Sequence, residues 1–318
     1  MLSRSAERLY WLARYLERTE NTARLLSVYM NLMFDMPMDV GVSWRNLLTI
    51  FGAEQAFLKL YEVPNEQNTM RFLLTDTDNP GSLFSCLNAA RENIRTSREL
   101  MPDEAWQQVN EMYLFAKNNV DNATNRRGRV LILTEIMRGC QCFTGFLSGA
   151  MSHNDALRFI RLGRSIERAD MTTRILDIAS VILAADDRSD KTRQYENALW
   201  MNVLKSLSAL LMYRKHRRHR ISSGDVLDYL LKDPDFPRSV RHCINEAEAY
   251  IKRLSKSGGL SDNLTLLSAT LMATDIHRIT PVQLHELLDD IQARLGVTHD
   301  QIASTWFLPP NQSQGQSA

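Results

Sequence analysis

The sequence is poor in the residues that interrupt regular structure and in those that cross-link it. Its 318 residues include only 13 glycines, 9 prolines and 4 cysteines, which excludes collagen-like, low-complexity and wholly disordered chains. A charge excess of one sign is lacking too. The 38 Lys and Arg residues face 37 Asp and Glu, so the net charge of +1 provides no global attraction to nucleic acid or to anionic membranes. Because 44% of the residues are hydrophobic, a chain of this length can bury a large core unaided.

Targeting signals and long hydrophobic runs are also lacking. The N-terminal stretch MLSRSAERLYWLARYLERTE carries charges every few positions and has no apolar centre, unlike a signal peptide. The most apolar run, residues 130–150, is interrupted by Glu135 and Arg138, so we expect no membrane span. Cys140 and Cys142 have no second cysteine pair at a metal-ligand spacing. We therefore predict a cytoplasmic protein without a bound metal or cofactor.

Helical periodicity, by contrast, runs through nearly the whole chain. Leu9, Leu12, Leu16, Ala23 and Leu26 recur at steps of three, four or seven, which predicts one long amphipathic helix. No segment shows the period-two alternation of a strand. The fold class is therefore predicted to be all-α. Further helices are expected near residues 41–61, 82–100, 103–122, 129–149, 152–184, 191–219, 223–231, 237–257, 262–276, 281–295 and 299–307.

An internal repeat divides the chain. When residues 12–26 are aligned with 162–176, seven of fifteen positions are identical, and further matches follow in order at offsets of 156 and 157. This pattern predicts a tandem duplication into helical halves, residues 1–150 and 151–308, related by a pseudo-two-fold axis and packed as a single globular unit. The tail, residues 309–318, lacks apolar side chains and is expected to be disordered.

Matched residues in the two halves indicate shared structural roles. Pro80 and Pro237 suit the first turn of a helix, where the missing N–H costs nothing. Asp78 and Asp235 stand just ahead of them as expected helix caps. Cys86 and Cys243 also occupy equivalent positions, which favours a packing role over redox chemistry.

The most prominent shared feature is the charged motif R-x-x-E-R-x-[ED]-x-x-x-R. It can form a solvated face, an ion network between the halves, or a pocket for a charged ligand. Because a buried ion is costly unless it is paired, we expect the two copies to face each other. The residues of the motif are Arg14, Glu17, Arg18, Glu20 and Arg24 in the first half, and Arg164, Glu167, Arg168, Asp170 and Arg174 in the second.

Motifs spread over the chain outside the tail carry a resemblance to a known family. They are Ala6-Glu7-Arg8, Tyr10-Trp11, Arg14, Glu17-Arg18, Glu20, Ala90-Arg91-Glu92-Asn93, Gly163-Arg164, Glu167-Arg168-Ala169-Asp170 and the stretch Asp233–Val240. Together they resemble the alpha-E family, helical proteins named for a Glu-Arg motif. The resemblance implies an all-α protein usually encoded beside a circularly permuted ATP-grasp ligase, sometimes fused to it, and often accompanied by a transglutaminase-like protein. It thus implies participation in ATP-dependent peptide or amide-bond formation.

The chain itself contains no recognisable catalytic motif. Phosphate-binding glycine loops, a G-x-S-x-G nucleophile motif and the Glu-x-x-His pairs of a di-iron bundle are all missing. The predicted function is therefore a non-catalytic helical partner of an ATP-grasp-type peptide or amide ligase, contributing binding, substrate presentation or regulation. One alternative is an enzyme of the same pathway that uses the Arg/Glu motif to bind a carboxylate or phosphate substrate.

A basic run distinguishes the second half from the first. It contains Arg214, Lys215, Arg217, Arg218 and Arg220. The run can be a solvated helix end, where cations suit the negative terminus of the helix dipole, or a site for phosphate, an acidic partner or RNA. Without interleaved aromatic residues it offers little sequence-specific RNA readout. An RNA or tRNA adaptor is thus the second alternative function.

Overall fold

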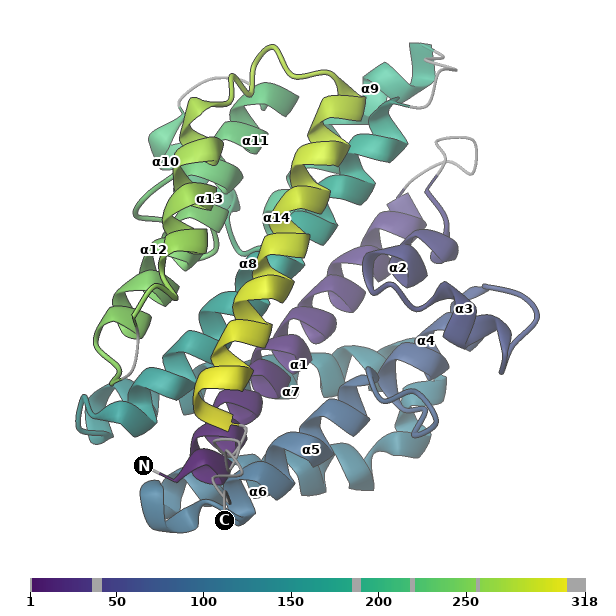
Figure 1. The fold of residues 1–318 in the computed structure, drawn as a ribbon. Helices are drawn as coiled ribbons and strands as arrows, with labels where there is room; N and C mark the ends of the chain where they lie inside the picture. Colours follow the sequence, from purple (N-terminus) through teal and green to yellow (C-terminus); the bar gives the residue numbers. More distant parts are fainter. Residues whose placement is uncertain (1, 36–41, 185–189, 218–220, 256–257, 308–318) are drawn as a thin grey trace, which may run out of the picture.

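The structure, a computed structural model, describes residues 2–35, 42–184, 190–217, 221–255 and 258–307 (Figure 1). It is 79% helical, and no strand occurs among the described residues. The predicted all-α class is confirmed. The predicted disorder of the tail falls outside the described residues, as do two members of the basic run, Arg218 and Arg220.

The helices of the first half precede residue 151. They are α1 (Ser3–Asp35), α2 (Trp44–Ile50), α3 (Glu54–Leu58), α4 (Glu66–Leu74), α5 (Leu83–Arg95), α6 (Asp103–Asn118) and α7 (Arg126–Ala150). Two short 3₁₀ turns join them, η2 (Arg98–Leu100) and η3 (Val120–Thr124).

The second half begins with another long helix and ends in a π-helical turn. Its elements are α8 (Asp155–Ala184), α9 (Asp190–Ser206), α10 (Leu210–His216), α11 (Ser223–Lys232), α12 (Val240–Lys252), α13 (Asp262–Ala273), α14 (Pro281–Ile302) and η4 (Ala303–Phe307).

The two longest described helices, α1 and α8, pack side by side at the centre of the molecule (Figure 1). Helix α1 also packs against α5 and α7, and α8 packs against α12 and α14. Gly163 permits a close approach, because a Cβ atom there would lie 2.3 Å from the backbone oxygen of Tyr10. With neighbours on several sides, α1 buries polar residues as well as its predicted apolar stripe; Glu17, Glu20 and Asn21 are all buried.

The starts of α5 and α12 differ from the expectation for Asp78 and Asp235. The caps are Ser82 and Ser239, whose hydroxyl oxygens accept hydrogen bonds from backbone N–H groups three residues later, both at 3.1 Å. The expected caps were wrong because the helices begin later than the prolines suggested, and a cap must have its oxygen one turn before the free N–H groups.

The paired cysteines have the predicted packing role. The thiol of Cys86 lies 3.7 Å from the oxygen of Pro80, and that of Cys243 lies 3.5 Å from the oxygen of Pro237. Both cysteines are buried, and burial raises the pKa of each thiol to about 12. Thiols with such high pKa values stay protonated and unreactive at neutral pH.

Helix α7 is the one described helix that is long and apolar enough to cross a membrane by length and composition. Core helices of soluble proteins meet the same criterion. Here α7 packs against α1 and α6, and it buries Ile132, Leu133, Ile136, Phe143 and Leu147. This packing is typical of a helix that covers the core of a helical domain.

Candidate functional site

The two copies of the charged motif meet where α1 and α8 pack together. Residues three and four apart share one face of a helix, so Arg14, Glu17 and Arg18 of α1 all reach the neighbouring helix α8. The expectation that the copies face each other agrees with the ion pairs that cross between these helices.

Glu167 of α8 holds two arginines of α1. Its carboxylate accepts hydrogen bonds from Arg14 Nε at 2.8 Å, from Arg18 Nε at 2.5 Å and from Arg18 Nη2 at 3.0 Å. The Glu167 side chain is 1% exposed. Burial opposes ionisation of this carboxyl, but Arg14 and Arg18 outweigh it and hold its pKa below the usual range.

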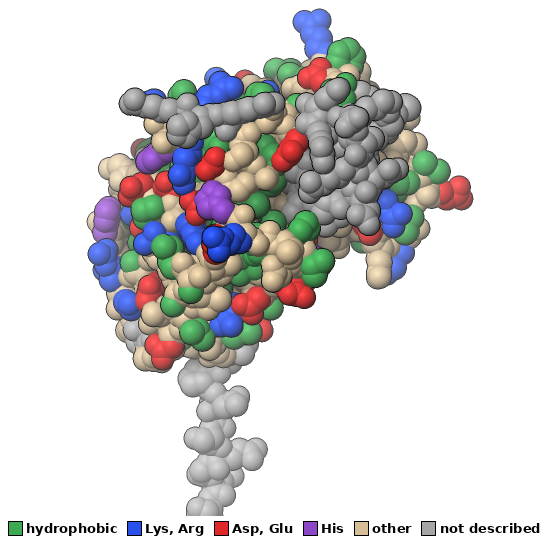
Figure 2. Space-filling view, turned by 90° about the horizontal axis from the view of Figure 1, so that it is seen from above, with side chains coloured by type: hydrophobic (Ala, Val, Ile, Leu, Met, Phe, Trp, Pro, Cys, Tyr) green, Lys and Arg blue, Asp and Glu red, His purple; other side chains and the backbone are tan. Residues whose placement is uncertain are grey.

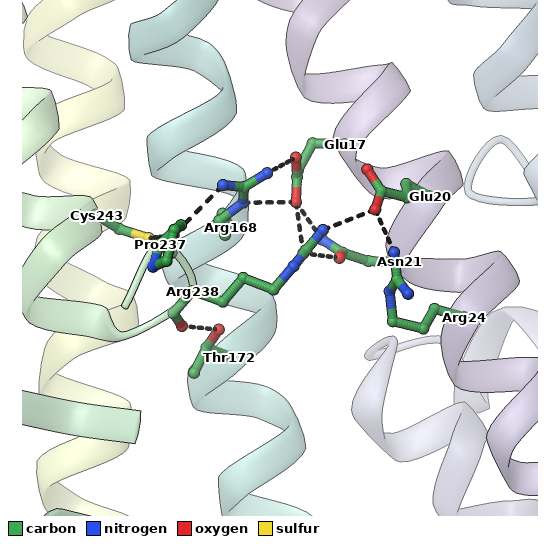
Figure 3. Close-up of polar contacts among 9 residues, drawn as sticks. All are labelled: Glu17, Glu20, Asn21, Arg24, Arg168, Thr172, Pro237, Arg238 and Cys243. Carbon is green, nitrogen blue, oxygen red and sulfur yellow. Dashed lines mark hydrogen bonds and ion pairs between the residues drawn. The ribbon is translucent and has the colours of Figure 1, made fainter. Parts of the chain in front are cut away.

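Glu17 of α1 is bound by arginines from two other elements (Figure 3). It accepts hydrogen bonds from Arg168 Nε at 2.9 Å and Nη2 at 2.7 Å, and from Arg238 Nη1 at 2.8 Å. Asn21 donates a further bond at 3.2 Å. Burial opposes ionisation here too, but Arg168 and Arg238 keep the pKa of Glu17 well below its usual range. The Glu17 carboxylate is therefore expected to stay ionised between these two arginines.

The network extends along α1 through Glu20. This carboxylate accepts a hydrogen bond from Arg238 Nη2 at 2.8 Å and also pairs with Arg24 (Figure 3). The corresponding pair on α8 joins Arg174 Nε to Asp170 at 2.8 Å. Nine of the ten predicted motif residues thus form ion pairs.

Arg238 is the member that sequence reasoning missed as a site residue. It lies just before α12, and it bonds Glu17, Glu20 and Asn21 at once. The repeat alignment contained a signal, since the position that matches Arg238 in the first half is Gly81. An arginine that replaces a glycine in one copy of a repeat adds a positive charge to only one half.

Arg164 is the predicted motif residue that has no hydrogen-bond or ion-pair acceptor among the described residues. Its counterpart Arg14 binds Glu167, but Glu17, the counterpart of Glu167, is occupied by Arg168 and Arg238. Burial and the nearby charge of Arg168 lower the pKa of Arg164, against the opposing effect of Glu17. Arg164 also borders a cavity of about 20 Å³ between α1, α7 and α8.

The described residues of the basic run differ in their surroundings. Arg214 and Lys215 are exposed in the last turn of α10, whereas Arg217 Nη2 donates to Asp228 of α11 at 2.6 Å. On the face shown in Figure 2, basic and acidic side chains are interspersed with hydrophobic ones. That view shows no single-sign patch.

One group of side chains could hold a metal ion by distance among the described residues, namely Asp177, His285 and Asp289. His285 Nδ1 lies 2.7 Å from Asp177, and Nε2 lies 3.5 Å from Asp289. The two carboxylates therefore lie next to different nitrogens of one imidazole ring. This geometry is an exposed hydrogen-bonded link between α8 and α14 rather than a convergent set of ligands.

The fold and the network define a class of all-α protein in which ion pairs between arginines and carboxylates join two central helices. The chain belongs to the alpha-E family, described as a predicted alpha-helical domain with a conserved ER motif, whose model matches residues 1–307. The ER dipeptide occurs at Glu17-Arg18 and Glu167-Arg168 in the network, and also at Glu7-Arg8.

The curated relatives are longer proteins. The chain is 24% identical over 306 residues to uncharacterized proteins of Mycobacterium bovis and Mycobacterium tuberculosis. These matches cover 90% of this chain but 34% of each relative, so the chain spans about one third of their length. No solved structure matches the chain.

Proposed function

We propose that this chain is a non-catalytic helical partner of a peptide or amide ligase of the circularly permuted ATP-grasp type. It would contribute binding surface, substrate presentation or regulation, and work in the cytoplasm, in some systems beside a transglutaminase-like protein. The proposal rests on the family and on one structural observation. The buried carboxylate of each of the two ER motifs in the network accepts hydrogen bonds from two arginines, which lower its pKa.

That observation favours a scaffold over an enzyme. General acid catalysis at neutral pH needs a carboxyl whose pKa is raised towards 7. Glu17 and Glu167 have lowered pKa values instead, because two arginines hold each of them. Their arrangement supports the packing of α1 on α8 and gives the enzyme alternative no support.

The test is purification of the chain at its native expression level, followed by an ATPase assay on the partner that is recovered. We expect an ATP-hydrolysing protein whose turnover with its acceptor substrate falls when the chain is removed and returns when purified chain is added back. An ATPase with the same turnover in the presence and absence of the chain would contradict the proposal.

We also propose that residues 1–150 and 151–308 arose by tandem duplication about a pseudo-two-fold axis. The order of packing supports it, since α1 contacts α5 and α7 while α8 contacts α12 and α14. The serine caps and buried cysteines at the starts of α5 and α12 repeat the same contacts. An experimental structure whose halves superpose only by a rotation far from a half-turn would contradict this origin.

The exposed cations of α10 favour a second candidate function, recognition of an acidic surface or of RNA. Arg214 and Lys215 are consecutive exposed residues in the last turn of α10, with no ion-pair partner among the described residues. Neighbouring like charges repel each other, and an approaching anionic surface removes that repulsion. Reversal of both charges, in Arg214→Glu/Lys215→Glu, tests this function.

A further inference from the structure

We propose that the cavity beside Arg164 is a binding site for the carboxylate head group of a small organic acid. The matched residues Arg14 and Arg164 differ in their contacts. Arg14 is satisfied by Glu167 and is covered by the ring of Trp11, 5.0 Å from its guanidinium carbon. Within the described part of the chain, Arg164 has neither a carboxylate partner nor an aromatic ring over it, and Arg161 stands at the position that matches Trp11.

An extra cation explains why Arg164 has no partner among the residues that the structure describes. Arg238 has a glycine as its counterpart, Gly81, and it enters the network with no added carboxylate. The network then contains seven arginines against four carboxylates. They are Arg14, Arg18, Arg24, Arg164, Arg168, Arg174 and Arg238 against Glu17, Glu20, Glu167 and Asp170. A largely buried excess of positive charge is costly unless an anion balances it.

The walls of the cavity match a carboxylate with a small apolar body. Arg164 and Arg161 line it three residues apart on α8, so their side chains share one face of the helix. Across from them lies Thr144 of α7, whose hydroxyl donates no hydrogen bond to any described residue. The remaining lining is mostly apolar, including Phe143 and Leu157.

Size and charge narrow the class of ligand. A volume of about 20 Å³ is little more than one water molecule requires, so only a head group can enter while the rest of the ligand stays at the mouth. Guanidinium groups bind carboxylates through paired hydrogen bonds. Glu17 and Glu20 border the same cavity and repel negative charge, which favours a singly charged carboxylate over a phosphate.

The experiment uses the full chain labelled with ¹⁵N and follows the Nε–Hε resonance of Arg164, assigned by its loss in Arg164→Gln. The probes are sodium acetate, N-acetylalanine and inorganic phosphate, each compared with sodium chloride at equal ionic strength. We expect saturable shifts with both carboxylates and at least tenfold weaker binding in Arg164→Gln, detected through neighbouring backbone amides. The matched control is Arg158→Gln, which removes an arginine of the same helix that pairs with Asp155 outside the network and should bind as the wild type does.

Further variants keep the test decisive if Arg164→Gln folds poorly. Arg164→Lys keeps the charge but loses the paired geometry, and Thr144→Val removes the hydroxyl with little change of shape. We expect both to fold and to bind acetate several-fold more weakly. Shifts no larger than those in chloride, or wild-type affinity for acetate in both Thr144→Val and Arg164→Lys, would overturn the site. Phosphate binding tenfold tighter than acetate would overturn the assigned class.

Discussion

The two ER glutamates of the network have similar surroundings, which differ in the origin and in the exposure of the bound arginines. Glu167 and Glu17 each have a side chain that is 1% exposed and two arginines bound to it. Both arginines on Glu167 come from one helix, α1, whereas those on Glu17 come from α8 and from the segment before α12. The first site joins two helices, and the second joins three elements.

The exposure of the bound arginines differs as well. Arg14 and Arg18 have side chains that are 12% and 28% exposed, while Arg168 and Arg238 are 14% and 9% exposed. A cation that loses its partner costs less free energy when water can reach it. The Glu17 site should therefore contribute more to the stability of the fold than the Glu167 site, although the two motifs are similar in sequence.

The largest effects are expected from removal of the two glutamates. Glu17→Ala leaves Arg168 and Arg238 without their main partner in a buried site, so we expect a loss of about 3–5 kcal/mol in the free energy of unfolding. Glu167→Ala should cost less, about 2–3 kcal/mol, because Arg18 can turn towards water. Equilibrium denaturation in urea measures both values.

Two outcomes would contradict this ranking. Equal losses for the two variants would mean that the third element adds nothing to the Glu17 site. A Glu17→Ala protein with unchanged stability but without effect on the turnover of the proposed ligase partner would instead assign the motif to ligand binding.

Acid should weaken both sites through their lowered pKa values. A carboxyl whose folded-state pKa lies below its unfolded value contributes stability above the unfolded pKa, near 4.5, and loses that contribution as the pH falls through the folded pKa. We therefore expect stability to fall steeply below about pH 5. The double variant Glu17→Gln/Glu167→Gln should show a shallower slope, measured by urea denaturation between pH 7 and pH 3. Identical slopes would contradict the contribution of these two groups.

Charge reversal on α10 tests a region where the two halves differ in sequence. Arg214→Glu with Lys215→Glu changes exposed side chains only, so the melting temperature should stay within a few degrees of the wild type. Binding of an acidic partner or RNA should weaken, and wild-type binding should fall with added salt. The control is Arg217→Gln, which breaks the ion pair with Asp228. If the double variant binds the partner as the wild type does, with the same salt dependence, the last turn of α10 is a solvated helix end.

The sequence predicted the facing motifs but not the inequality between them. Spacing within a helix places Arg14, Glu17 and Arg18 on one face, and repetition indicates that a second copy is present to meet them. The contact between Arg238 and Glu17 joins residues 221 positions apart. Periodicity is local and carries no information about such a distance. Neither this contact nor the lack of a partner for Arg164 among the described residues could therefore be predicted.

The smallest effect on the free energy of unfolding is expected at the exposed link between α8 and α14. This link contains charged groups without burial, so it separates the effect of charge from that of burial. The hydrogen bond to Asp177 raises the pKa of His285, with smaller support from Asp289 and Glu286. A raised folded-state pKa contributes stability that is complete below the unfolded value, near 6.5, and is lost as the pH rises through the folded pKa. Because the His285 side chain is 51% exposed, solvent screening should keep this contribution below about 1 kcal/mol.

The variant His285→Ala tests that contribution by urea denaturation at pH 5.5 and pH 8.5. We expect a small destabilisation at the lower pH and almost none at the higher one, because the imidazole is neutral there and its attraction to the carboxylates has gone. The pH dependence is thus opposite in sign to that of Glu17 and Glu167. A loss as large as that of Glu17→Ala would show that burial does not set the strength of ion pairs in this protein, and the distinction between the two ER sites would fall with it.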